Sequence, residues 1–467
     1  MKYIAFAAAI AAVAAVPQLG AKQEQKSNVY TSGDRACMVG DSITEGGWYE
    51  QNIMLYYTTR FPEMQVDFRN IGISGDICLR ILNRMESDVL PQLDKSKSVT
   101  VLMIGMNDVD MYKFAPQTRA KIGEAELRRR IADSRSVYER RLGQVVDFLA
   151  PNSRRLILFT PSIYDQTAEL PKVNYAGTND ELEVYGKIGA KIAAKIPNAS
   201  VVDMQTKMKV VNAELQSKEG KTKTIISPDR VHPRFAGGFV MLNAWLERFG
   251  EPREVSTVEI DAAAQKLDKS FNCDISNLSF GGGAIAFDLL AAALPFPVEK
   301  AARNLDGYMK FAQNFNREIL KISGLQSGEY SLEIDGKKVG AYSAKQLADG
   351  VNLATNTNTP QYKQAEDVHN LCGKFRAETV WFRKMRGLEF ANAAKMDKLD
   401  VDGKIAFIKS LLETNTKAPS YVKKSYKYYI ENRKRADEKF AEIGKIAEDA
   451  YRAATPKTRS YKIEKIK

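Results

Sequence analysis

Five short apolar runs, separated by longer stretches with helical periodicity, constrain the fold of this chain more than any other feature. The runs lie at 36–40, 64–72, 99–105, 155–161 and 199–204, and helix-like stretches such as 124–149 and 180–196 lie between them. Strands that alternate with helices indicate βαβ units and a parallel sheet covered on both faces. We therefore expect an α/β domain, with ligands bound at the carboxyl ends of its strands.

The composition changes after Pro252, and from about 255 to 354 the pattern becomes strand-like. Tyr330, Leu332 and Ile334 alternate with polar residues before Asp335-Gly336, a pair that is typical of a hairpin turn. The stretch 281–298 is almost entirely apolar, but it contains an aspartate and two prolines, so we interpret it as buried strand and loop. A chain of 467 residues is long enough for two or three such domains.

From about residue 360 the chain becomes helical in pattern and basic. Residues 360–467 hold 25 Lys and Arg against 15 Asp and Glu, which is most of the formal net charge of +12. The stretch 421–435 mixes tyrosines with lysines. It fits an amphipathic helix whose core stripe is Val422, Tyr426, Tyr429 and Ile430. The alternative is a surface that contacts an anionic polymer or a membrane.

The N-terminus has the layout of a secretory signal peptide. One lysine precedes an apolar stretch from Tyr3 to Val16, and small residues follow as far as Ala21. The stretch is too short for a stable membrane span, and the alternative is a buried N-terminal helix. We expect residues 1–21 to be cleaved and the mature chain to be secreted or periplasmic.

Four cysteines, Cys37, Cys78, Cys273 and Cys372, would meet an oxidising compartment after export. Two lie in each half of the chain, so one disulfide in each half is the simplest of the three possible pairings; buried thiols are the alternative. Their spacings match no zinc pattern, and we predict no metal and no cofactor.

The stretch CMVGDSITEGG (37–47) places a serine between a strand and a helix. Gly40 and Asp41 end the apolar run, and Ser42 begins the next helical pattern. The free N–H groups and the positive dipole end of that helix suit a nucleophile that must support a developing oxyanion. A helix cap is the structural alternative.

A nucleophilic serine needs a base, and the chain has only two histidines, His232 and His369. Asp229 precedes His232 by three residues, so the carboxylate and the ring can point to one side of a turn. Asp229 would orient the ring while its other nitrogen takes the Ser42 proton. We expect His369 to be structural.

Two further stretches follow predicted strands and offer hydrogen-bond donors to an oxyanion. NIGISGD (70–76) presents the N–H of Gly75, and IGMND (104–108) presents the amide of Asn107. Two or three such donors make an oxyanion hole, and losing one costs about 10²–10³ in turnover.

These blocks together resemble the SGNH hydrolases, also called GDSL-type esterases, over residues 33–250. The matching residues, in chain order, are Gly40, Asp41 and Ser42, then Asn70, Gly72 and Gly75, then Gly105, Asn107 and Asp108, and finally Asp229 and His232. The resemblance implies a flavodoxin-like three-layer fold and hydrolysis through an acyl-serine. By it, Ser42 is the nucleophile, His232 the base and Asp229 its orienter, and Ser42, Gly75 and Asn107 form the oxyanion hole.

One residue departs from the family pattern: Arg230 stands where many members have glycine. We expect it to narrow or charge the rim of the pocket. The segment 320–354 also resembles one found behind SGNH domains in secreted bacterial proteins, many of them taken to act on glycans.

The expected organisation is a signal peptide (1–21), an SGNH domain (28–252), a β-rich module (253–355) and a basic helical region (356–467). The expected activity is removal of short acyl groups, acetyl above all, from a carbohydrate, with no nucleic-acid partner. A lipid acyl hydrolase is one alternative, and an apolar groove near Trp48, Tyr49, Met54 and Leu55 would favour it. An inactive glycan- or surface-binding protein is the other.

Overall fold

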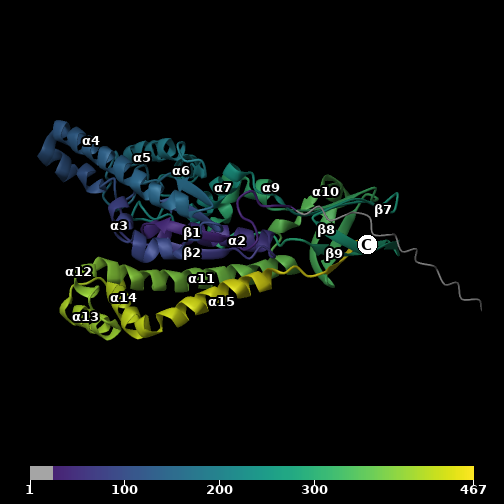
Figure 1. Cartoon of the computed structure of the whole chain (residues 1–467). Coiled ribbons are helices and arrows are strands. Elements are labelled where there is room, and N and C mark those ends of the chain that lie inside the picture. The colour runs from purple at the N-terminus through teal and green to yellow at the C-terminus, as the bar shows by residue number, and fades with distance from the viewer. Residues whose placement is uncertain (1–24, 467) are drawn as a thin grey trace, which may run out of the picture.

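The computed structural model describes residues 25–466, and the predicted signal peptide (1–21) lies outside them (Figure 1). In this part of the chain, no helix combines the length and the apolar character that crossing a membrane requires.

The first domain is built on a five-stranded sheet in the order β2-β1-β3-β4-β5. All four strand pairings are parallel, as the alternating apolar runs predict. The strands are β1 (Arg35–Gly40), β2 (Asp67–Gly72), β3 (Ser98–Met103), β4 (Arg155–Phe159) and β5 (Ala199–Val202). Parallel pairing brings all their carboxyl ends to one edge of the sheet, where the candidate site residues follow.

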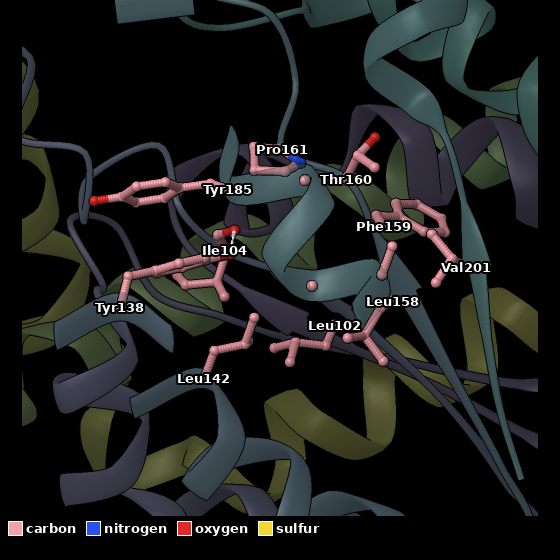
Figure 2. A pocket seen from close by; sticks show the side chains of 13 residues that line it. Leu102, Ile104, Tyr138, Leu142, Leu158, Phe159, Thr160, Pro161, Tyr185 and Val201 are labelled. Carbon is pink, nitrogen blue, oxygen red and sulfur yellow. Dashed lines mark hydrogen bonds between the residues drawn. The ribbon is translucent and has the colours of Figure 1, made fainter. Parts of the chain in front are cut away.

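Helices cover both faces of this sheet, which gives the predicted three layers. They are α1 (Ser42–Glu45), α2 (Trp48–Arg60), α3 (Cys78–Asn83), α4 (Pro116–Leu149), α5 (Thr178–Ala193), α6 (Met204–Glu219) and α7 (Arg234–Phe249). Helices α4 and α5 enclose one small apolar cavity against β3 and β4 (Figure 2). On the other face, Tyr49 of α2 and Trp245 of α7 pack against Phe159 of β4.

Two smaller sheets follow, in the orders β13-β10-β6-β7 and β12-β11-β14-β9-β8. Their strands are β6 (Glu254–Asp261), β7 (Lys266–Phe271), β8 (Cys273–Gly281), β9 (Ala284–Ala291), β10 (Arg317–Ser323), β11 (Glu329–Ile334), β12 (Lys337–Ser343), β13 (Val351–Asn352) and β14 (Arg459–Lys465). Short helices α8 (Asp306–Met309), α9 (Phe311–Phe315) and α10 (Ala344–Asp349) lie between them. The two sheets share one hydrophobic core, separate from that of the first domain.

The predicted hairpin is present as β11 and β12. Asp335 and Gly336 both have positive φ, which a two-residue turn with the right-handed twist of the strands requires. Residues 356–467 are helical as expected up to their end, where the structure has a strand that the sequence analysis did not predict. Strand β14 lies inside the second sheet between β11 and β9, because Tyr461 and Ile463 alternate with charged residues and bury their side chains there.

The remaining C-terminal region is helical, with α11 (Pro360–Ala391), α12 (Ala393–Met396), α13 (Val401–Thr414), α14 (Ser420–Asn432) and α15 (Ala436–Ala454). Helices α11 and α15 form a long pair that runs beside β2 and α2 (Figure 1). Their apolar residues, among them Phe375 and Ile446, join the core of the first domain.

The amphipathic interpretation of 421–435 is confirmed for the tyrosines. In α14, Tyr426 and Tyr429 are buried in a local core, and Val422 and Ile430 pack against it. The Tyr429 hydroxyl also donates to Glu389 at 2.9 Å.

The expectation of one disulfide in each half is wrong. Cys37, Cys78, Cys273 and Cys372 are all free and buried. They lie on β1, at the start of α3, on β8 and inside α11, where each packs as a small apolar side chain. Burial raises the pKa of the Cys37, Cys273 and Cys372 thiols to about 12, so they remain neutral and unreactive.

Candidate active site

The turn between β1 and α1 presents Ser42 at the carboxyl edge of the sheet. Asp41 caps α1 through its side chain, which accepts the Ile43 N–H at 2.9 Å. The preceding glycine is required by close packing: a Cβ on Gly40 would lie 2.4 Å from the Met103 carbonyl oxygen of β3. Burial raises the pKa of Asp41 to about 7, although the Ile43 N–H opposes this shift.

The structure brings Ser42, His232 and Asp229 into one hydrogen-bonded row. His232 Nε2 lies 2.9 Å from Ser42 Oγ, and His232 Nδ1 lies 2.8 Å from Asp229 Oδ2. The His232 side chain retains 38% of its exposure, so the row opens to solvent. Proton transfer from the serine to the ring needs no movement of either side chain at this separation.

Asp229 contacts both the imidazole ring and the backbone of the turn that carries it. Its second oxygen, Oδ1, accepts the Val231 and His232 N–H groups at 2.9 and 3.0 Å, and the Ser227 hydroxyl at 2.6 Å. Burial would raise the pKa of Asp229, but the hydrogen bonds from His232 and Ser227 hold it well below its usual range. The carboxylate is therefore ionised wherever the ring could act as a base, and it also fixes the turn that carries the ring.

The predicted oxyanion donors come from three successive strand ends. The backbone N–H groups of Ser42 and Gly75 donate to no residue in 25–466. The Asn107 side-chain amide donates one hydrogen to the Asp76 carbonyl at 2.9 Å and keeps its other hydrogen free. Gly75 has φ +79°, a left-handed conformation that orients this N–H at little cost only in glycine.

Residues 38–238 match the family model described as the GDSL-like lipase/acylhydrolase family. This domain belongs to that family. Ester hydrolysis is the chemistry of such a domain, and the matched residues include every member of the hydrogen-bonded row.

Two known proteins are similar to this chain, one over the GDSL-like domain and the other over almost the whole chain. An acetylxylan esterase of Geobacillus stearothermophilus is 26% identical over 234 residues, which cover 47% of this chain and 95% of the relative. A solved structure, described as a gut microbial diltiazem-metabolizing enzyme, is 27% identical with a TM-score of 0.84. That similarity covers 96% of this chain and the whole of the other, so it includes the β sheets and the C-terminal helices.

Two stacked tyrosines of α4 and α5 support the turn that carries Asn107 in the GDSL-like domain. Tyr138 of α4 and Tyr185 of α5 have ring centroids 4.0 Å apart, and Figure 2 shows both beside Ile104. The Tyr138 hydroxyl donates to the Ile104 carbonyl at 3.2 Å, and the Tyr185 hydroxyl to the Asp108 carbonyl at 3.4 Å. These bonds flank Asn107 on both sides and restrict the backbone that aims its amide.

The expectation that Arg230 shapes the pocket rim of the GDSL-like domain is wrong. Arg230 is 3% exposed, and its guanidinium donates to carbonyl oxygens between Asp165 and Lys172. Its φ of +70° explains why glycine is common at this position. The side chain ties the loop after β4 to the turn that carries His232.

The other histidine lies elsewhere. His369 is on α11, partly buried, with Nε2 3.6 Å from Glu299 Oε2. Burial lowers its pKa despite that carboxylate. Residues 25–466 contain no group of His, Cys, Asp and Glu side chains arranged to hold a metal ion.

The sequence interpretation missed the contribution of α11 to the GDSL-like domain. The Arg376 guanidinium lies 3.4 Å from the centroid of the Trp48 ring and donates to the Gly46 carbonyl at 3.2 Å. Lys384 forms an ion pair with Glu45 of α1, and Arg383 is buried against the end of β2. No local pattern predicts these contacts, because the partners are more than 300 residues apart in the chain.

Proposed function

We propose that this chain is an exported serine esterase that removes short acyl groups, acetyl above all, from a carbohydrate. The observation that carries the proposal is the row from Ser42 through His232 to Asp229, with both hydrogen bonds below 3 Å. The matched family and the acetylxylan esterase relative support the acetyl ester as substrate.

In the proposed first half-reaction, Ser42 Oγ attacks the ester carbonyl carbon and passes its proton to His232 Nε2. The carbonyl oxygen becomes an oxyanion that the N–H groups of Ser42 and Gly75 and the Asn107 amide stabilise. The intermediate collapses, the bond between the acyl carbon and the sugar oxygen breaks, and His232 gives its proton to that departing oxygen, which leaves as a hydroxyl group. Asp229 stabilises the imidazolium between these two transfers.

In the second half-reaction, water replaces the alcohol. His232 takes a proton from the water as its oxygen attacks the acyl carbon, and the same donors hold the new oxyanion. Collapse breaks the bond to Ser42 Oγ, which recovers its proton from the ring. The products are a free sugar hydroxyl and a short carboxylic acid.

The lipid-hydrolase alternative depends on an apolar groove that these residues do not form. Tyr49, Met54 and Leu55 are at most 1% exposed and belong to the core. Trp48 is covered by Arg376 and by Phe235, whose ring centroid lies 4.1 Å from its own. A long acyl chain would gain about 0.8 kcal/mol per buried CH₂, but only where such a surface exists.

The test is a series of 4-nitrophenyl esters from C2 to C12, together with acetylated xylo-oligosaccharides. We expect kcat/KM to be highest for C2 or C4 and to fall at least tenfold by C8. A profile that rises from C8 to C12 would assign the protein to the lipid hydrolases. Mass measurement of the mature exported chain tests the second part of the proposal, since cleavage after Ala21 removes residues 1–21.

A further inference from the structure

Helix α11 of the C-terminal region reaches the oxyanion side of the proposed active site through Lys384. Lys384 Nζ lies 3.0 Å from Glu45 Oε1, and the Glu45 side chain is 4% exposed. The same carboxylate accepts the Ser74 hydroxyl at 2.6 Å and the Ser74 N–H at 2.9 Å. Glu45 thereby links the helix of Ser42 to the residue that directly precedes the donor Gly75.

Arg383, the residue beside Lys384, holds the other end of the same turn. Its Nε donates to the Gly72 carbonyl at 3.2 Å, and its two terminal nitrogens donate to the Asp88 carboxylate at 3.1 and 2.7 Å. The side chains of Arg383 and Asp88 are 2% and 4% exposed. Helix α11 therefore holds this turn at Gly72 directly, through Arg383, and at Ser74 indirectly, through the Glu45 carboxylate that Lys384 pairs with.

The network continues from Asp88 to the second side of the oxyanion hole. Arg84 donates to Asp88 at 2.7 Å, to Asp76 at 2.8 Å and to the Ile71 carbonyl at 2.8 Å. The carbonyl of Asp76 is the acceptor of the Asn107 amide.

The negative charges of Asp88 and Asp76 in this buried network are balanced by arginines. Burial opposes ionisation of Asp88, but the guanidinium groups of Arg383, Arg84 and Arg386 lower its pKa to about 2. Burial raises the pKa of Asp76 to about 6, and Arg84 limits that rise. A buried network with this many hydrogen bonds to charged groups has little freedom to shift.

We propose that Lys384 and Arg383 are positioning residues for acyl transfer: they hold the Gly75 N–H and the Asn107 amide at the spacing that the developing oxyanion requires. This inference rests on the proposed function. Preorganised donors act on the transition state rather than on the bound substrate, so the residues of α11 contribute to kcat more than to KM.

The first experiment compares Lys384→Ala with Lys384→Arg and with the control Lys374→Ala, an exposed lysine on the same helix. Removing an oxyanion donor costs about 10²–10³ in turnover, so displacing one should cost about tenfold. We expect Lys384→Ala to lower kcat on the acetyl ester about tenfold, with KM changed less than twofold. Lys384→Arg should recover most of the activity, and Lys374→Ala should match the wild type.

A second readout separates positioning from folding. A serine-directed phosphonate places its P=O oxygen where the oxyanion forms, so its rate of labelling Ser42 should fall in Lys384→Ala in parallel with kcat. Arg383→Lys, which keeps the charge but cannot contact Gly72 and Asp88 together, should show a larger loss. Thermal unfolding of each variant is measured beside the kinetics.

The inference is overturned if Lys384→Ala equals Lys374→Ala in kcat, or if phosphonate labelling is unchanged while kcat falls. It is also overturned if the loss of kcat equals the unfolded fraction at the assay temperature. Failure of the proposed function would give a different result: the wild-type chain would hydrolyse no ester, and no phosphonate would label Ser42.

Discussion

Replacing Asp229 by asparagine should damage catalysis more than replacing it by alanine. Oδ1 of Asp229 already accepts three hydrogens, from the Val231 and His232 N–H groups and from the Ser227 hydroxyl. Only Oδ2 faces His232 Nδ1. In Asp229→Asn the amide oxygen should stay with those three donors, because only an oxygen can accept them.

The amide nitrogen must then face the ring. An N–H that points at Nδ1 makes Nδ1 an acceptor and places the ring proton on Nε2, next to Ser42 Oγ. That tautomer cannot take the serine proton, and the same change in the Ser-His-Asp protease template lowers kcat about 10⁴-fold. Asp229→Ala leaves the tautomer free. It removes the hydrogen bond to the charged ring, worth about 1.5–3 kcal/mol, or about 10- to 100-fold in kcat, together with the three hydrogen bonds of Oδ1 that fix the turn. The 43% exposure of the Asp229 side chain favours the lower end of that range.

The assay is kcat on 4-nitrophenyl acetate at pH 8, with circular dichroism and thermal unfolding to verify that both variants fold. Asp229→Ala and Asp229→Asn should both retain the fold, and the asparagine variant should be at least tenfold slower than the alanine variant. An asparagine variant that is faster than the alanine variant would refute the assignment of Oδ1 to the backbone and Oδ2 to the ring.

Three further predictions follow from the described contacts. Ser42→Ala should abolish ester hydrolysis and phosphonate labelling without a change in thermal unfolding, and wild-type turnover in this variant would contradict the mechanism. His232→Ala should lose several orders of magnitude in kcat, whereas His369→Ala should be near normal; the reverse order would show that the wrong histidine was assigned. Burial raises the pKa of Glu50 to about 7, so the folded state keeps this proton longer than the unfolded chain and stability falls as pH rises from about 4 to about 7. Glu50→Gln removes that loss, so urea denaturation should show a gain over the wild type of about 3 kcal/mol at pH 8 that vanishes near pH 4; an equal effect at both pH values would contradict it.

The first domain could be predicted from its sequence because its signals are local. Each predicted strand is found within a few residues of its apolar run, and the blocks that follow the strands meet at one edge because parallel pairing requires it. Ser42, Gly75, Asn107, Asp229 and His232 carry residue types that the chemistry itself demands, so their roles could be proposed before their positions were known.

The remaining features depend on partners that sequence spacing does not encode. Arg230 resembled a rim residue because its neighbours are catalytic, yet its positive φ turns the guanidinium toward the loop after β4. The paired cysteines of the sequence interpretation lie in different layers of packed core. Arg383 pairs with Asp88 across 295 residues, and Lys384 pairs with Glu45 across 339. Neither charge nor periodicity indicates which acidic residue each cation contacts.

The interior position of β14 has a consequence for the order in which the chain acquires its structure during synthesis. Strands β9 and β11 have no direct pairing with each other and are bridged by β14, and Arg459 contacts Asp335 across a separation of 124 residues. While a ribosome is still translating the helices of the C-terminal region, both strands present unpaired edges that could pair with another chain. Closure of so long a loop is slow. Nascent chains arrested before Arg459 should therefore recruit chaperones to the β sheets, and release of the strand should end that recruitment.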